Sequence, residues 1–308
     1  MSKVRVVLHP AHPFGVADFL SSVSEIQLEQ PRDNAAVAAC LQDGAEALVT
    51  YTWRDEFLSP SLRWVAGTGA GTEQYPLERL RARDVVLTTA AGAHSGTVAE
   101  HAFALLLSLT RRIGEAVRHM TESRWTPLVG EELAGKRMAV IGLGRIGEEI
   151  ARRAANWDMQ VAGMKRNPGN YAGCLQDVRG EDALQDLCAW ADVLMLAAPA
   201  KPDGSALIGA KELELLGAGW LVNVGRGSLV DADALRAALS QGALRGAGLD
   251  VTSPEPLPED SPLWLSPKVV VSAHYAGSSS GYAARWGRIF TQNLQALREG
   301  ADWENRLI

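Results

Sequence analysis

Residues 137–147 read Arg-Met-Ala-Val-Ile-Gly-Leu-Gly-Arg-Ile-Gly, and this stretch decides the fold. The apolar run 138–141 predicts a buried strand, and a helix is predicted over 146–155. Between them the glycines fit the pattern G-x-G-x-x-G, in which the first permits a tight turn, the second admits a pyrophosphate, and the third lets the helix pack on the strand. The helix N-terminus adds N–H donors for the phosphates. The stretch therefore predicts a dinucleotide site rather than an ordinary glycine-rich turn, formed by Gly142, Gly144, Arg145, Ile146 and Gly147.

Short apolar runs alternate with helical patterns on both sides of this motif. Strands are predicted at 4–8, 47–49 and 64–65 before it, and at 161–164, 193–196, 221–224, 248–251 and 269–272 after it. Helices are predicted at 34–41 and 282–298, and residues 94–118 read as one long helix because apolar residues recur at helical spacing. This alternation favours parallel sheets with crossover helices.

Composition narrows the class of protein. The chain has 308 residues, enough for about two domains, and 30 basic against 36 acidic residues give a net charge of −6. Without a basic cluster, neither nucleic acid nor a membrane surface is expected as a partner. Cys40, Cys174 and Cys188 lie far apart, which disfavours a zinc ribbon and a disulfide framework. The first residues show no signal pattern, and the longest apolar stretch is too short to span a bilayer, so we expect a soluble, cytoplasmic protein.

The end of the next strand bears on the choice of cofactor. NAD sites usually carry an acidic residue about 20 positions past the glycine motif, where it bonds the ribose hydroxyls. Here Met164 is followed by Lys165, Arg166 and Asn167, with no acid. Two cations would attract a 2′-phosphate, so NADP(H) is predicted over NAD(H), although NAD remains possible; a solvated basic pair is the alternative interpretation.

Three later segments place ionisable residues directly after apolar strands. They contain Arg226, then Asp250 and Glu255, then His274. Because ligands bind at the carboxyl ends of strands in open α/β sheets, these side chains are expected to converge on one cleft.

Taken together, these motifs resemble the D-isomer-specific 2-hydroxyacid dehydrogenases, most strongly between residues 94 and 277. The resemblance rests on five segments: Val98-Ala99-Glu100-His101, 142–147, 223–231, 249–258 and Ala273-His274-Tyr275-Ala276-Gly277. The intervals from Arg226 to Asp250 and from Asp250 to Glu255 are also like those of the family.

The resemblance implies a function for each residue. Arg226 would hold the substrate carboxylate and carbonyl oxygen, for which its planar fork is suited. His274 would donate a proton to the carbonyl oxygen, while Glu255 would fix the ring and favour the imidazolium. Asp250 would bond the nicotinamide amide. Further cofactor contacts would come from Pro199, Val224 and Gly277.

In the first part of the chain, Gly67-Thr68-Gly69-Ala70-Gly71-Thr72-Glu73 resembles the family loop whose backbone N–H groups bind the substrate carboxylate, at Ala70 and Gly71. A glycine-rich turn without a ligand is the alternative. Two interpretations, lining of the substrate pocket and packing in the core or at the rim, are open for Tyr51, Thr52 and Trp53. His94 and His101 are interpreted as interface or hinge residues.

Two departures from the family pattern lie near the expected site. Thr252 stands where an aromatic residue is common, and Ser272-Ala273 replaces the usual Thr-Pro. Neither removes a catalytic group. The first part of the chain matches the family least, so the substrate is the least determined feature.

The expected architecture is α/β. A Rossmann-type doubly wound parallel sheet domain, 92–278, is inserted into a smaller flavodoxin-like α/β substrate domain formed by 1–91 and 279–308. Both ligands would bind in the cleft between the domains. The helix at 94–118 would pack in a homodimer, as the resemblance implies.

The leading functional hypothesis is an NADP(H)-dependent reductase of a small 2-oxoacid such as glyoxylate or hydroxypyruvate, which in reverse oxidises a D-2-hydroxyacid. The alternative is a binding protein that senses nicotinamide dinucleotides on the same fold, as related corepressors do, but the compact length favours the enzyme. A Tyr-x-x-x-Lys dehydrogenase is excluded because no tyrosine has Lys four residues later. No metal site is predicted, since no His, Cys and acidic residues have ligand-like spacing.

Overall fold

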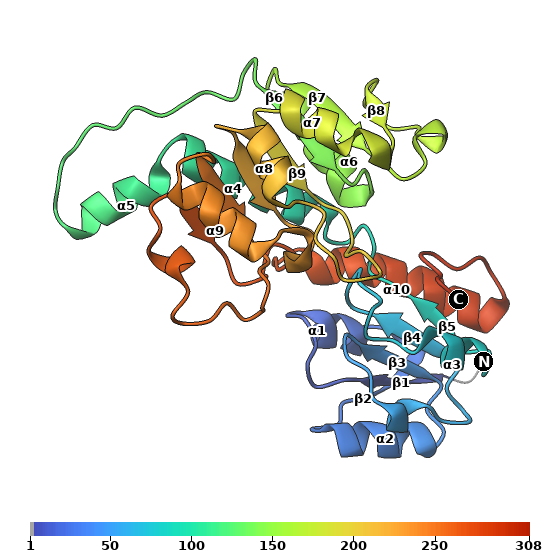
Figure 1. Ribbon diagram of the computed structural model, residues 1–308. Helices are drawn as coiled ribbons and strands as arrows, with labels where there is room; N and C mark the ends of the chain where they lie inside the picture. The colour runs from blue at the N-terminus through green and yellow to red at the C-terminus, as the bar shows by residue number, and fades with distance from the viewer. Residues whose placement is uncertain (1–2) are drawn as a thin grey trace. The chain divides into compact units, whose positions relative to one another are not determined.

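The computed structural model describes residues 3–308 and divides the chain into two compact units (Figure 1). The terminal unit contains the residues up to His94 together with Ser278–Ile308, and the central unit is Ser95–Gly277. The central unit is therefore one continuous segment, and the terminal unit is formed by the two segments on either side of it. The sequence predicted these borders after residues 91 and 278.

The terminal unit is built on a five-stranded parallel sheet in the order β2-β1-β3-β4-β5. This is the flavodoxin-like order of doubly wound sheets. Its strands are β1 (Val4–Leu8), β2 (Ile26–Glu29), β3 (Ala47–Thr50), β4 (Trp64–Gly67) and β5 (Val86–Thr88). The helices are α1 (Val16–Ser21), α2 (Asn34–Gln42), the short η1 (Asp55–Phe57), α3 (Leu77–Arg81) and α10 (Tyr282–Glu299).

Helix α10 brings the end of the chain into this unit. Its side chains Trp286 and Phe290 are buried in one core with Trp64, whose ring stacks on Phe290 at 5.0 Å between centroids. The Tyr282 hydroxyl donates to the carbonyl oxygen of Thr68 at 2.7 Å. The return helix therefore also holds the segment that follows β4.

The central unit has a seven-stranded parallel sheet in the order β12-β11-β10-β9-β6-β7-β8. Counted from β6, this is the Rossmann order with one added strand, and it reverses between β6 and β9. The strands are β6 (Arg137–Ile141), β7 (Gln160–Met164), β8 (Val178–Arg179), β9 (Val193–Leu196), β10 (Trp220–Asn223), β11 (Gly246–Leu249) and β12 (Val269–Val271). The predicted fold class, a doubly wound Rossmann-type domain beside a flavodoxin-like one, is confirmed.

Helices cover both faces of this sheet, and the interior strands β9, β10 and β11 are wholly buried. The α-helices are α4 (Ser95–Thr110), α5 (Ile113–Thr121), α6 (Arg145–Ala155), α7 (Leu184–Trp190), α8 (Ala210–Leu216) and α9 (Ala232–Ser240). Short turns of 3₁₀-helix lie at Pro168–Asn170, Glu181–Ala183, Gly227–Leu229 and Pro262–Leu265. Among residues 3–308 no helix has the length and apolar character needed to cross a membrane.

The prediction of one helix over 94–118 is wrong. The chain forms α4 and α5, and Arg112 between them has φ 56°, a left-handed conformation that cannot continue the backbone ladder of a helix. Apolar residues recur at helical spacing on both sides of Arg112, so the sequence pattern does not reveal the break. Helix α4 is buried along one face, whereas α5 buries none of its residues and projects from the sheet.

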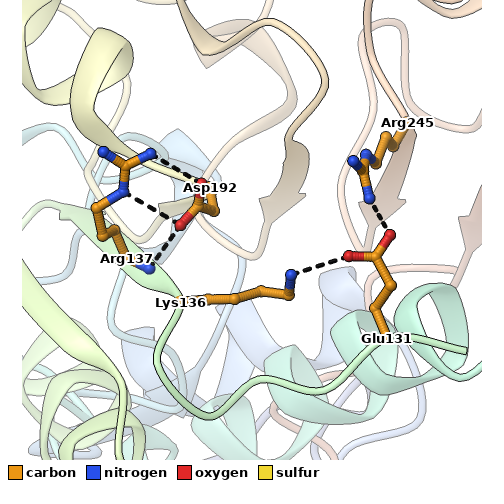
Figure 2. A network of polar contacts seen from close by, with 5 residues as sticks. All are labelled: Glu131, Lys136, Arg137, Asp192 and Arg245. Atoms are coloured by element: carbon orange, nitrogen blue, oxygen red, sulfur yellow. Dashed lines mark hydrogen bonds and ion pairs between the residues drawn. The ribbon is translucent and has the colours of Figure 1, made fainter.

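Residues 111–130, which we call the arm, leave and rejoin the central unit at one place. The N–H of Glu131 donates to the carbonyl oxygen of Thr110 at 2.8 Å. Figure 2 shows the carboxylate of Glu131 between Lys136, at 2.9 Å, and the guanidinium of Arg245. These contacts fix both ends of the arm to the sheet, so α5 is held at its base although its sides are exposed.

Candidate active site

The glycine turn after β6 has the geometry of a phosphate-binding loop. Gly142 has φ 102°, and a Cβ there would lie 2.6 Å from the backbone nitrogen of Ala198. A Cβ on Gly147 would lie 2.0 Å from the carbonyl oxygen of Gly142, so only glycine lets α6 pack this closely. A Cβ on Gly144 would meet nothing within 4 Å. The turn is tight where the chain packs and open where a pyrophosphate must approach, so these residues fit a dinucleotide.

The two cations after β7 are arranged differently from one another. Lys165 donates to the carbonyl oxygen of Leu143 at 3.0 Å and lies over the ring of Tyr171, so its ammonium supports the glycine turn. The side chain of Arg166 is 73% exposed, and its one ion pair among the described residues is with Glu181 at 3.4 Å. Of the predicted phosphate ligands, Arg166 is therefore the cation that stays accessible, with Asn167 beside it.

A contact that the sequence did not reveal ties the segment after Asn167 to α6. The carboxylate of Glu148 accepts from the Tyr171 hydroxyl at 2.5 Å and from the N–H of Cys174 at 2.6 Å. Partial burial alone would raise the pKa of Glu148, but these hydrogen bonds outweigh it and lower that pKa below its usual value. The segment is thus anchored beside the first turn of the helix that follows the glycine motif.

His274 and Glu255 form a direct pair in the central unit. The Nδ1 atom of His274 lies 2.5 Å from Oε1 of Glu255, and both side chains are about half exposed, at 44% and 43%. Among the described residues, Nε2 of His274 has no hydrogen-bond partner. The carboxylate can therefore fix the orientation of the ring, while Nε2 is available to exchange a proton with a ligand.

Asp250 follows β11 and is 3% exposed. Its Oδ1 accepts from the Ser272 hydroxyl at 2.7 Å and from the N–H of Tyr275 at 3.1 Å, and its Oδ2 accepts from the N–H of Ala276 at 3.1 Å. Its carbonyl oxygen accepts from the N–H of His274 at 2.8 Å. The backbone of 274–276 therefore wraps around this aspartate, and its predicted contact with a nicotinamide amide remains a prediction.

His101, which the sequence suggests as an interface or hinge residue, has a hydrogen-bond partner that the sequence did not reveal. Its Nε2 lies 2.7 Å from the Ser272 hydroxyl, inside the central unit, and its side chain is 17% exposed. Residues 101 and 272 are far apart in sequence, so helical spacing could not reveal the contact. His94 belongs to the terminal unit, where its ring stacks on Tyr282 at 4.7 Å.

Arg226 lies in a tight turn after β10. The side chain of Asn223 braces this turn, accepting from the N–H of Gly225 and donating to the carbonyl oxygen of Arg226. A Cβ on Gly227 would lie 1.8 Å from the carbonyl oxygen of Thr252, so the turn packs directly on the segment that leads to Glu255.

The predicted residues follow strands that are neighbours in the sheet. Arg226 and Val224 come after β10, Asp250 after β11 and His274 after β12. Pro199 lies exposed after β9, and Gly277 is the last residue of the unit. The carboxyl edge of one sheet thus carries a cation for an anionic group and a histidine for proton transfer. Among residues 3–308 no group of three His, Cys, Asp or Glu side chains could hold a metal ion.

In the terminal unit, the loop after β4 presents unpaired backbone donors. Among the described residues the N–H groups of Gly69, Ala70 and Gly71 have no acceptor, and the Thr68 hydroxyl is buried without a partner. A Cβ on Gly69 would lie 2.4 Å from the ring of Tyr51, so that ring lies against the loop. Consecutive free N–H groups are an arrangement that binds anions.

The ring of Trp53 packs against aromatic side chains of the terminal unit. It makes edge contacts with Phe57 and Tyr75, at 6.0 and 6.5 Å between centroids.

Comparison with known proteins agrees with this geometry. The sequence profile of the "D-isomer specific 2-hydroxyacid dehydrogenase, NAD binding domain" matches residues 103–276. A glyoxylate reductase of Korarchaeum cryptofilum is 30% identical over 90% of this chain and 83% of that protein. A D-3-phosphoglycerate dehydrogenase of Methanocaldococcus jannaschii is 29% identical over 97% of this chain, which spans only 58% of its length.

Solved structures give the same result. The NADPH-dependent glyoxylate/hydroxypyruvate reductase of Sinorhizobium meliloti, solved with NADP and malonate, superposes with a TM-score of 0.84 and 28% identity, over 99% of this chain and 97% of that one.

Proposed function

Because this chain belongs to the D-isomer specific 2-hydroxyacid dehydrogenase family and is an NAD(P)-dependent oxidoreductase, we propose that it reduces a small 2-oxoacid of the glyoxylate or hydroxypyruvate type, with NADPH as the preferred reductant. The observation that carries the proposal is the 2.5 Å pair of His274 and Glu255 at the sheet edge that also holds Arg226. The substrate class is supported by the relatives that match, which include a glyoxylate reductase and a glyoxylate/hydroxypyruvate reductase.

The proposed chemistry assigns a separate task to each side chain. The nicotinamide, when bound, supplies a hydride to the carbonyl carbon of the 2-oxoacid. His274 donates the proton that the carbonyl oxygen needs as its double bond is reduced, and takes it back in the reverse direction. Glu255 stabilises the imidazolium during this cycle. Arg226 binds the carboxylate and carbonyl oxygen through its planar guanidinium, which orients the carbon for attack.

We assign the substrate carboxylate a second set of donors in the loop after β4. The N–H groups of Ala70 and Gly71, which have no acceptor among the described residues, support this assignment, because consecutive N–H groups of this kind can bind an anion.

NADPH preference is proposed from the end of β7, where no carboxylate stands to repel a 2′-phosphate and where Arg166 is exposed. The wild-type enzyme is expected to show a higher kcat/KM with NADPH than with NADH. Arg166→Glu should lower kcat/KM for NADPH by about 10–100-fold, because a charge-assisted hydrogen bond is lost and repulsion is added, and should leave NADH within about threefold.

Steady-state kinetics with both cofactors measure this change. Arg236→Glu is the matched control, since Arg236 is an exposed arginine that pairs with Asp233 on α9. Equal or better efficiency of the wild type with NADH, or an equal loss for both cofactors in the Arg166 variant, contradicts the assignment.

We further propose that the arm 111–130 packs against a second copy of this chain. The arm is fixed at its base, yet it leaves large apolar side chains in solvent, and a surface of this kind favours self-association. These side chains are Ile113, Val117, Met120, Trp125 and Val129.

A dimer is therefore expected by sedimentation velocity at micromolar concentration. Val117→Asp should raise the dimer dissociation constant by at least about tenfold, because burying one such side chain contributes about 1.5–3 kcal/mol. Leu265→Asp is the control, since Leu265 is 91% exposed outside the arm. A monomeric wild type, or an equal effect of both substitutions, counts against the arm as the interface.

A further inference from the structure

The contact between His101 and Ser272 links helix α4 to the loop that carries the acid–base histidine. The Ser272 hydroxyl lies 2.7 Å from Nε2 of His101 on one side and 2.7 Å from Oδ1 of Asp250 on the other. Ser272 is 8% exposed and Asp250 3%, so water does not compete freely for these bonds. The three side chains form a buried chain of hydrogen bonds.

Which group donates in each of these hydrogen bonds follows from the number of protons that each side chain can give. A carboxylate only accepts, and the Ser272 hydroxyl has one proton, which it gives to Asp250. The serine oxygen must then accept from His101, so Nε2 of His101 carries a proton. The ring is thereby a donor aimed at the serine, and it also lies 3.5 Å from Oδ1 of Asp250.

The aspartate at the end of this series of hydrogen bonds holds the backbone that follows β12. It accepts from the N–H groups of Tyr275 and Ala276 through its carboxylate and from the N–H of His274 through its carbonyl oxygen. His274 itself has φ 51°, a left-handed conformation that a residue with a side chain keeps only where its surroundings restrain it. Three successive N–H groups bonded to one residue supply that restraint.

We propose that His101 and Ser272 are positioning residues of the reaction. His101 orients the Ser272 hydroxyl, the hydroxyl fixes the carboxylate of Asp250, and Asp250 keeps residues 274–276 in the turn that directs the His274 ring onto Glu255. Neither His101 nor Ser272 need touch substrate or cofactor. This inference rests on the proposed function, because it takes His274 as the proton donor.

Paired substitutions separate this role from simple packing. Ser272→Ala removes both hydrogen bonds of the Ser272 hydroxyl, and His101→Leu removes the one between His101 and Ser272. In contrast, Ser272→Thr keeps the hydroxyl and His101→Gln keeps an N–H donor at a similar reach. Glu100→Gln is the control on the same helix, since the exposed Glu100 makes only a 3.7 Å ion pair with Arg153.

Two measurements are made on the full chain: steady-state kinetics of 2-oxoacid reduction, and hydrogen exchange of the peptide that contains residues 273–277. Ser272→Ala and His101→Leu should lower kcat by about 10–100-fold with the KM for the cofactor within about threefold, because a misplaced acid slows the chemical step. The amides of Tyr275 and Ala276 should exchange at least about tenfold faster. Ser272→Thr and His101→Gln should stay within about threefold of wild type in both measurements.

Unchanged amide exchange in Ser272→Ala and His101→Leu overturns the proposal, as does a loss that Ser272→Thr and His101→Gln fail to restore. Thermal melts identify a variant that does not fold. If a variant at one of the two positions does not fold, the two variants at the other position test the proposal. The exchange measurement needs no turnover. If the wild type reduces no 2-oxoacid, the proposed function fails, while faster exchange still supports the hydrogen-bond chain as a restraint on the turn.

Discussion

His274→Gln is expected to lower kcat for 2-oxoacid reduction by about 10²–10⁴-fold, the range that a positioned general acid contributes. Glutamine keeps a polar side chain of similar length but cannot deliver a proton at neutral pH. Because the ring is half exposed and contributes no core packing, the variant should fold normally and keep its affinity for the cofactor.

The measurement is a steady-state assay of His274→Gln beside Glu255→Gln, with cofactor binding followed by fluorescence. Glu255→Gln should give a smaller loss of kcat, about 10–100-fold, because the acid is still present but its ring has lost the charged partner at 2.5 Å. Full turnover by the His274 variant on the best substrate would remove this residue from the mechanism.

Arg226→Gln is expected to lower kcat/KM for the 2-oxoacid by about 10²–10³-fold, because two charge-assisted hydrogen bonds to the substrate are lost. Arg226→Lys should recover only part of this loss, since an ammonium keeps the charge but not the planar fork. The Arg226 side chain donates one hydrogen bond to the turn, at the carbonyl oxygen of Gly225. The turn itself should survive the loss of that bond, because the side chain of Asn223 still accepts from the N–H of Gly225 and donates to the carbonyl oxygen of residue 226.

Substrate saturation curves for both variants measure this loss, with the KM for NADPH as the internal control. A Gln variant within about fivefold of wild type in kcat/KM would show that the carboxylate is bound elsewhere, and the N–H groups of the loop after β4 would then be its main donors.

Local patterns predicted most of the fold. The glycine motif, the buried strands and the long amphipathic helix at the C-terminus are each encoded within a short window, and the order of elements is enough to predict two parallel sheets. The break at Arg112 was missed because a left-handed residue other than glycine leaves no mark in the apolar spacing.

The residues of the proposed site can be named from the sequence, but their contacts cannot. Arg226, Asp250, Glu255 and His274 stand out because each follows a strand in a recognisable motif. In contrast, the helical spacing around His101 says which face of α4 it occupies but not that Ser272 lies there. The charge of Lys165 predicts a phosphate ligand, yet its ammonium bonds the backbone of Leu143, and only three-dimensional packing decides between these two roles.

The most direct test of the account is a panel of small 2-oxoacids, with glyoxylate and hydroxypyruvate among them, assayed on the full chain with NADPH and with NADH. We expect turnover of at least one of them, a higher kcat/KM with NADPH, and the D-enantiomer of any chiral product. Tight binding of NADPH without reduction of any 2-oxoacid would contradict this expectation and would favour a protein that senses the dinucleotide.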